Sequence, residues 1–171
     1  MAGGYVGETA VGIAAAVRAG RVSPTEVLEE HLERIAALDG QLGAFRLLRT
    51  AEVRAEARAL DGRDDLGRLP LAGVPVAVKD NIDLAGCPTR NGSAATGPEP
   101  AAADDELVRR LREAGALLVG KTNVPELGLW PFTESEAFGA SRNPWSLDHT
   151  PGGSSGGSAA VVASAMVPVA L

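Results

Sequence analysis

Residues 149–171, HTPGGSSGGSAAVVASAMVPVAL, form the stretch around which the rest of the chain is organised. A glycine–serine segment, residues 152–158, runs directly into an apolar segment rich in alanine and valine, residues 159–167. Glycines let another group approach the backbone closely, and a following helix directs its unpaired N–H groups back toward them. A flexible linker has a similar composition, but the compact apolar continuation favours a structured loop leading into a buried helix.

The composition is that of a globular chain. Of the 171 residues, 45% are hydrophobic and 4% aromatic, so we expect a core of Ala, Val and Leu. A net charge of −6 without a long basic run argues against nucleic acid as a direct partner. A single cysteine, Cys87, favours a reducing compartment. No apolar run reaches the ~20 residues needed to span a bilayer, so we expect a cytoplasmic protein that does not bind membranes.

Three helices are predicted in the first 70 residues. The first covers residues 9–19, and the third covers residues 50–60. The second has the clearest signals, because Ser23 and Glu26 form a capping box and Pro24 occupies the first helical position. Gly40 is expected to end it.

The pattern changes after residue 70. Val74–Val78 is a β-branched apolar run typical of a buried strand, and Lys79 follows at its carboxyl end. A long Gly- and Pro-rich loop, residues 86–104, precedes a helix that ends at Gly115 and a second short strand over residues 116–119. Strand, helix and strand in this order predict an α/β fold with a mainly parallel sheet. Residues 167–171 read as a further strand.

Two motifs match enzyme signatures but lack the required context. Residues 115–122, GALLVGKT, fit the P-loop pattern, yet the four residues that should form a phosphate-binding loop are themselves the strand. We expect Lys121 and Thr122 instead to end this strand and face the same crevice as Lys79. Residues 152–156, GGSSG, fit the nucleophile elbow, but the acid and histidine that should follow the serine are missing and His149 precedes it.

A lysine and a group of serines remain as candidate catalytic residues. In Ser–Lys enzymes an amine replaces histidine as the base, and this amine must be neutral to accept a proton. Burial lowers a lysine pKa because desolvation disfavours the charged form. Lys79, at the end of a buried strand, could be placed in this way, although a surface lysine leaving a strand has the same sequence pattern.

The chain resembles the amidase signature family. Four segments carry the resemblance, and the most specific is the last: GVPVAVKDNID (73–83), GALLVGKTNVPELG (115–128), SRNPW (141–145) and TPGGSSGGSAA (150–160). The resemblance implies an α/β/α sandwich with a mixed central sheet, present here as an incomplete N-terminal portion. It implies a single incomplete amidase domain over residues 1–171, with N-terminal helices over 1–70 and the start of the α/β catalytic core over 71–171.

The resemblance also implies a Ser–cis-Ser–Lys triad that cleaves carboxamide C–N bonds through an acyl-enzyme. Lys79 matches the catalytic lysine, and Ser154, preceded by a cis peptide bond, matches the serine that relays the proton. Gly152, Gly153, Ser155 and Gly156 would form the surroundings of the site, with Ser155 as a hydrogen-bonding neighbour. No cofactor and no metal are implied. The nucleophilic serine of the family lies further along than Leu171, so we expect residues 1–171 alone to be inactive and prone to aggregation.

Three functions remain open at this point. The first is hydrolysis of a small-molecule amide by a stand-alone amidase, in which a homodimer is possible. The second is service as the amidase subunit of a glutamine-dependent tRNA amidotransferase, with partner subunits. The third is a non-catalytic remnant that keeps the lysine and the bridging serine without a nucleophile.

Overall fold

The computed structural model describes residues 4–171. Its centre is a four-stranded sheet with the strand order β1-β3-β2-β6. The strands are β1 (Phe45–Leu48), β2 (Pro75–Lys79), β3 (Leu117–Thr122) and β6 (Val169–Ala170). β2 pairs in parallel with both β3 and β6, whereas β1 runs antiparallel to β3. The sheet is therefore mixed, as the resemblance implied.

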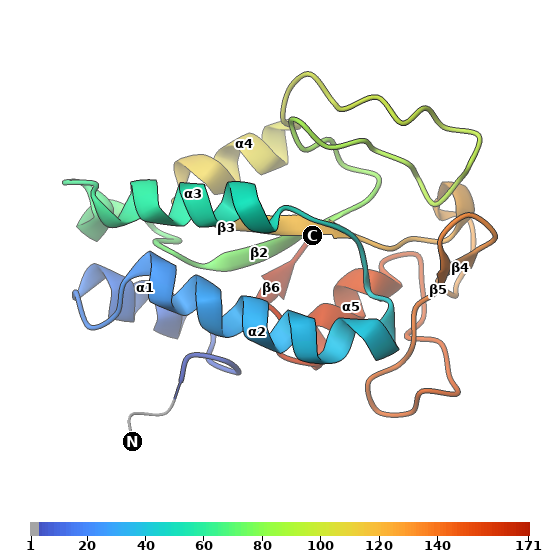
Figure 1. The fold of residues 1–171 in the computed structure, drawn as a ribbon, viewed down its shortest axis with the longest axis horizontal. Helices are drawn as coiled ribbons and strands as arrows, with labels where there is room; N and C mark the ends of the chain where they lie inside the picture. Colours follow the sequence, from blue (N-terminus) through green and yellow to red (C-terminus); the bar gives the residue numbers. More distant parts are fainter. Residues whose placement is uncertain (1–3) are drawn as a thin grey trace.

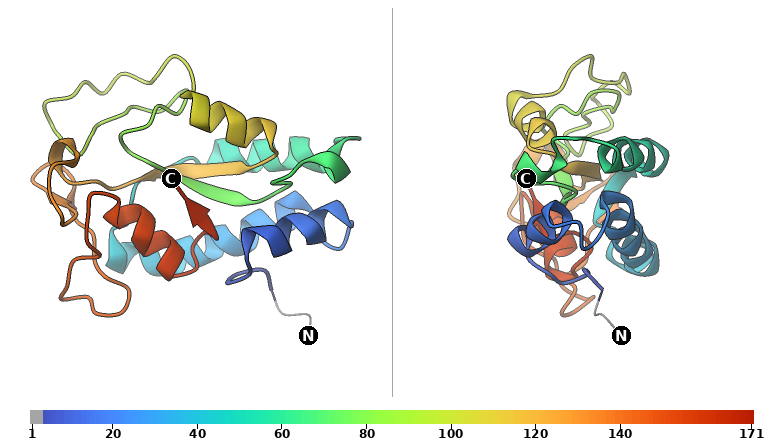
Figure 2. Two further views of the ribbon diagram at one scale, coloured as in Figure 1. Left: turned by 180° about the vertical axis from the view of Figure 1, so that it is seen from behind. Right: turned by 90° about the vertical axis from the view of Figure 1, so that its left-hand side faces the viewer.

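Helices lie on both sides of this sheet. They are α1 (Ala10–Arg18), α2 (Pro24–Leu42), α3 (Thr50–Asp61), α4 (Glu106–Glu113) and α5 (Gly156–Ala163). In Figure 1, α2 and α3 lie in front of the sheet and α4 lies behind it, and the reversed view in Figure 2 brings α4 to the front. α5 packs against β2 and β6. Among the described helices none has the length and apolar character needed to cross a membrane.

α2 begins as predicted but ends later. Ser23 caps the helix in a capping box with Glu26, and Pro24 is its first residue. Gly40 lies within the helix instead of ending it. The helix continues to Leu42, and the left-handed residue that ends it is Gly43, with φ of 54°. Asp39 accepts hydrogen bonds from the backbone N–H groups just beyond, at Ala44 and Phe45, and so turns the chain into β1.

Other parts of the chain also differ from the expectations. β1 was not predicted, and it adds a strand to the segment expected to hold only helices. β3 ends at Lys121 and Thr122, as expected for these two residues, so it is longer than the apolar run over residues 116–119 suggested. α5 starts at Gly156, inside the glycine–serine segment, and ends at Ala163 rather than at residue 167. A short hairpin of β4 (Glu134–Ser135) and β5 (Gly139–Ala140), which no sequence pattern predicted, lies before residue 150.

The core is built from aliphatic side chains, as the composition suggested. Thirty-two hydrophobic residues are buried, and Phe45 is the single aromatic residue among them within the described chain. β2 and β3 form its centre, since every residue from Pro75 to Val78 and from Leu117 to Thr122 is buried. The sheet end that carries Lys79 is therefore held by a rigid, fully packed pair of strands.

Candidate active site

Lys79 and Ser154 meet at the carboxyl end of β2. The Lys79 Nζ lies 2.8 Å from the Ser154 Oγ, although the two residues are 75 positions apart in the sequence. Lys79 is half-buried, and burial lowers the pKa of its amine below the ordinary value of 10.5. A lowered pKa increases the fraction of neutral amine, which is the form that can accept a proton.

The loop that carries Ser154 is fixed on both sides by one buried threonine. Thr133 Oγ1 donates a hydrogen bond to the carbonyl of Gly152 at 2.8 Å and accepts one from the N–H of Gly156 at 3.1 Å. Between these two tethers, the peptide bond from Gly153 to Ser154 is cis. Because both tethers end on backbone groups, the position of Ser154 depends on the loop as a whole.

The glycines of this loop are needed for close approach. A Cβ on Gly153 would lie 2.7 Å from the carbonyl oxygen of Trp130, and one on Gly156 would lie 2.1 Å from Thr133 Oγ1. Both distances are far below van der Waals contact, so a side chain at either position would displace the neighbouring segment. Gly152 has a φ of 90°, which side-chain-bearing residues rarely adopt.

Ser155 has a different environment from Ser154. It is exposed at the N-terminal boundary of α5, and its hydroxyl does not cap that helix. Ser158, one turn into α5, lies 2.7 Å from Thr122 through their hydroxyl oxygens. Of the serines in the segment 152–158, it is Ser154 that contacts Lys79.

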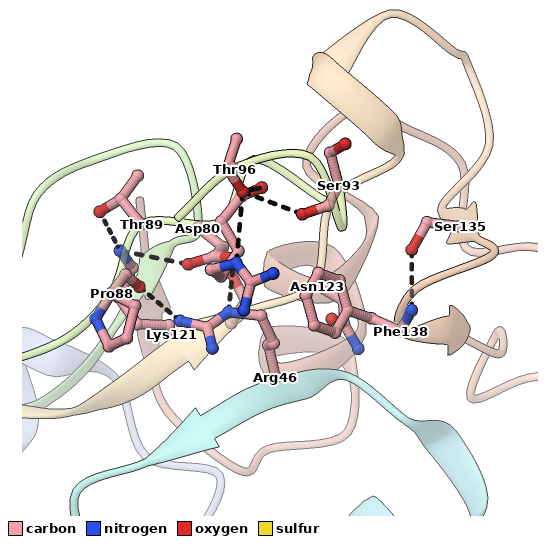
Figure 3. Close-up of polar contacts among 12 residues, drawn as sticks. Arg46, Asp80, Pro88, Thr89, Ser93, Thr96, Lys121, Asn123, Ser135 and Phe138 are labelled. Carbon is pink, nitrogen blue, oxygen red and sulfur yellow. Dashed lines mark hydrogen bonds and ion pairs between the residues drawn. The ribbon is translucent and has the colours of Figure 1, made fainter. Parts of the chain in front are cut away.

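The expectation that Lys121 faces the same crevice as Lys79 is wrong. Successive side chains of a strand point to opposite faces, and Thr122, which pairs in register with Lys79, is the residue that reaches α5. Lys121 points the other way and has no exposed surface. Its Nζ lies 3.2 Å from Asp80 Oδ1, and Arg46 Nε lies 2.5 Å from Asp80 Oδ2. Figure 3 shows this network of Arg46, Asp80 and Lys121.

The Lys121 ammonium has two further oxygen partners. It donates hydrogen bonds to the carbonyl of Ile82 at 2.8 Å and to Thr89 Oγ1 at 2.9 Å. Burial lowers the pKa of Lys121, and the Asp80 carboxylate opposes that shift. A lysine enclosed in this way is not available to a nucleotide phosphate, and the residues before it form β3. The geometry therefore does not fit a P-loop.

The hydrogen-bond partner of His149 is not a serine of the glycine–serine segment, so this histidine does not form the His–Ser pair of a serine hydrolase. Its Nδ1 lies 2.8 Å from the hydroxyl of Ser146, in the loop that precedes the glycine–serine segment. Within residues 4–171, no group of three or more His, Cys, Asp or Glu side chains is placed to hold a metal ion. The chemistry that this site can support is proton transfer between a neutral amine and a hydroxyl.

Sequence reasoning missed three residues around this site. Asp80 directly follows Lys79 in the sequence, within the segment KDN (79–81), and this was the only signal for the network of Arg46, Asp80 and Lys121. Arg46 lies in β1, which was not predicted. Thr133 lies in a stretch without periodicity, and nothing in the sequence indicated its contact with residues about twenty positions later.

Comparisons with known proteins show which family this chain is similar to. Residues 26–171 match the family model described as Amidase. The chain is 58% identical over 153 residues to AmiB2 of Mycobacterium tuberculosis, a protein assigned as an amidase. The aligned region covers 89% of this chain and 33% of that protein. It is 46% identical over 165 residues to a glutamyl-tRNA(Gln) amidotransferase subunit of Acidothermus cellulolyticus, which covers 95% and 33% of the two chains.

Solved structures show the same relationship. The native peptide amidase of Stenotrophomonas maltophilia superposes with a TM-score of 0.88 at 38% identity, over 97% of this chain and 36% of that one. The 6-aminohexanoate cyclic dimer hydrolase in complex with its substrate gives a TM-score of 0.87 at 38% identity, over 95% and 33%. The chain spans about a third of the length of the curated relatives that it matches. By family match, sequence identity and fold, this chain belongs to the amidase signature family.

Proposed function

We propose that Lys79 and Ser154 are catalytic residues of an amidase that hydrolyses a carboxamide C–N bond. The observation that carries this proposal is the 2.8 Å contact between the Lys79 Nζ and the Ser154 Oγ, with a lysine pKa lowered by burial. The family match supports the same reaction class.

In this proposal Lys79 is the general base and Ser154 relays the proton. The neutral Lys79 amine accepts the proton of the Ser154 hydroxyl, while Ser154 takes the proton of a nucleophilic serine hydroxyl. From the resemblance to the family, we expect that nucleophile further along than Leu171. Attack on the amide carbonyl then forms the acyl-enzyme, and the proton returns through Ser154 to the departing amine. Water hydrolyses the acyl-enzyme and releases the carboxylic acid, with Lys79 again acting as base.

The test uses the longest open reading frame that contains residues 1–171. Ammonia release from a panel of aliphatic and aryl primary amides is measured for the wild type, Lys79→Ala, Ser154→Ala and Ser155→Ala. The proposal predicts loss of at least about 10³-fold in kcat for the first two variants, as for other members of a catalytic unit. Ser155→Ala is the matched control, because its exposed hydroxyl does not contact Lys79. Full activity in Lys79→Ala or Ser154→Ala would refute the assignment.

A second candidate is the amidase subunit of a tRNA amidotransferase. The observation that favours it is the 46% identity to the amidotransferase subunit of Acidothermus cellulolyticus. In this role the substrate amide is the side chain of glutamine, and partner subunits are required. Copurification with partner subunits and glutamine-specific ammonia release would favour this candidate. Activity of the isolated protein on simple amides, with none on glutamine, would favour the stand-alone amidase.

A further inference from the structure

Lysine is used at only two positions in this chain. The 171 residues contain fourteen arginines but only Lys79 and Lys121 as lysines. Both stand at the carboxyl ends of neighbouring strands, β2 and β3. Arginine offers a planar fork of donors, whereas lysine offers a compact ammonium with three donors. The Lys121 Nζ donates hydrogen bonds to the carbonyl of Ile82 and to Thr89 Oγ1, and it forms an ion pair with Asp80.

We propose that Lys121, acting with Asp80 and Arg46, is a positioning residue that holds the Lys79 amine against Ser154. This inference rests on the amide hydrolysis proposed above and adds to it a second lysine, which never contacts the substrate.

The contacts of Lys121 enclose the turn that begins at Lys79. The N–H of Ile82 donates to the carbonyl of Lys79 at 3.0 Å and closes this turn. The carboxylate of Asp80 and the carbonyl of Ile82, both within the turn, are held by the Lys121 ammonium. The turn is therefore held from the face of the sheet opposite to Ser154. A change at Lys121 is expected to move the backbone of Lys79 and with it the position of the Lys79 amine.

The backbone of Asp80 fixes the same point from two more directions. Its N–H donates to the carbonyl of Thr122 at 3.1 Å, and its carbonyl accepts from the N–H of Asn91 at 3.0 Å. Arg46 completes the enclosure by donating to the carbonyl of Pro88 at 2.6 Å while its Nε faces Asp80. β1, β3 and the loop 86–104 are thus all joined to the residue that follows Lys79 (Figure 3).

Stability alone does not account for this network. The side chains of Arg46, Asp80 and Lys121 are 8%, 1% and 0% exposed, so two cations and one anion are taken out of water together. Buried ionic groups of this kind can often be replaced by apolar side chains without loss of stability. Their position beside Lys79 fits a role in fixing one geometry of the site.

The test compares Lys121→Met with the wild type in the open reading frame that contains residues 1–171. Methionine keeps a long unbranched side chain but removes the ammonium. Because a displacement of about 1 Å can cost 10²-fold in rate, we expect kcat per folded molecule to fall at least about 10-fold with KM within about twofold. Arg54→Met is the matched control, since it removes a half-exposed ion pair with Glu29 that lies on α2 and α3. It should keep wild-type kcat.

A second readout does not depend on turnover. Lys79 is half-buried and Lys121 is fully buried, so labelling with acetic anhydride followed by peptide mass spectrometry reports the titration of the Lys79 amine. We expect its midpoint to move up toward 10.5 in Lys121→Met, because an amine released from its place beside Ser154 gains solvent. Thr89→Val removes one acceptor of Lys121 and no charge, so the same upward shift there reports position alone. Thr89→Val also replaces Lys121→Met as the test variant if Lys121→Met does not fold.

The outcomes separate the two proposals. A wild type that hydrolyses no amide refutes the proposed function, and the Lys79 titration then decides the positioning role by itself. An active wild type in which the variants lose stability, but keep both kcat per folded molecule and the Lys79 midpoint, refutes the positioning role and leaves the proposed function intact. A fall in kcat at constant KM, together with a shifted Lys79 midpoint, supports the positioning role of Lys121.

Discussion

Thr133→Val tests whether the loop that carries Ser154 is held by the two tethers of one hydroxyl. Thr133 is 2% exposed, and valine has nearly the same shape, so the substitution removes the hydroxyl without opening a cavity. It leaves the N–H of Gly156, which is buried, and the carbonyl of Gly152 without their partner. An unsatisfied buried polar group costs about 1–3 kcal/mol.

We therefore expect Thr133→Val to lower the free energy of unfolding by about 2 kcal/mol, most of it from the buried N–H of Gly156. Because Ser154 lies between the two tethers, kcat should fall as well. Thr133→Ser is the matched control, since it keeps the hydroxyl and should retain most of the stability and activity.

The assay is urea denaturation of the open reading frame that contains residues 1–171, followed by circular dichroism, with amide hydrolysis measured on the same preparations. A Thr133→Val protein whose free energy of unfolding stays within about 0.5 kcal/mol of the wild type, the range of neutral surface changes, would show that the hydrogen bonds to Gly152 and Gly156 do not hold the loop.

Three further predictions follow from individual residues. Because burial lowers the pKa of Lys79, kcat/KM should fall as the pH drops through that lowered pKa. Stability should rise with pH between the lowered pKa and 10.5, because in this range only the unfolded chain holds the proton. Lys79→Arg cannot lose its proton and should be inactive at every pH, so activity in that variant would contradict the role of the neutral amine. Gly40→Ala should raise stability by up to about 1 kcal/mol, because Gly40 lies inside α2 with open space around it. Gly157→Ala should destabilise the protein strongly, because its Cβ would lie 2.6 Å from the carbonyl oxygen of Ala44. Urea denaturation of both variants checks this pair of predictions, and equal stabilities of the two variants would contradict them. Isothermal titration calorimetry with Mg-ATP should show no binding, since Lys121 is enclosed by protein oxygens, and binding that is lost in Lys121→Met would reverse that view.

Local signals predicted the start of α2 but not its end. A capping box needs only Ser23 and Glu26, which are three residues apart, so the sequence contains the whole motif. Ending at Gly40 was wrong, because a helical glycine is tolerated where tertiary packing continues the helix. Gly43 ends it instead, with a left-handed φ and Asp39 folded back onto the next N–H groups. That choice depends on where the chain must turn to enter the sheet.

Strand β1 shows why pairing is harder to predict than periodicity. Its four residues, FRLL, include a charged side chain and follow α2 closely, so no apolar run marks them. They form a strand because they pair with β3, where Gly120 lets the carbonyl of Leu47 approach closely. That contact links segments more than seventy residues apart, and no local pattern contains it.

The candidate site divides in the same way. The end of a buried strand made Lys79 a candidate from the residues alone, but its meeting with Ser154 came from the family resemblance. Lys121 was placed on the wrong face, because the register of β3 against β2 decides which of two adjacent side chains points toward α5. Asp80 and Arg46 were missed, since their importance arises from a strand that was itself missed.

The most direct measurement of the central claim is a double-mutant cycle on Lys79 and Ser154. The kcat of amide hydrolysis is measured for the wild type, Lys79→Ala, Ser154→Ala and the double variant, in the open reading frame that contains residues 1–171. If the 2.8 Å contact makes the two residues one catalytic unit, each single variant should lose nearly as much activity as the double variant, as in other catalytic units. Losses that simply multiply, or a single variant that retains wild-type kcat, would show that Lys79 and Ser154 do not act together.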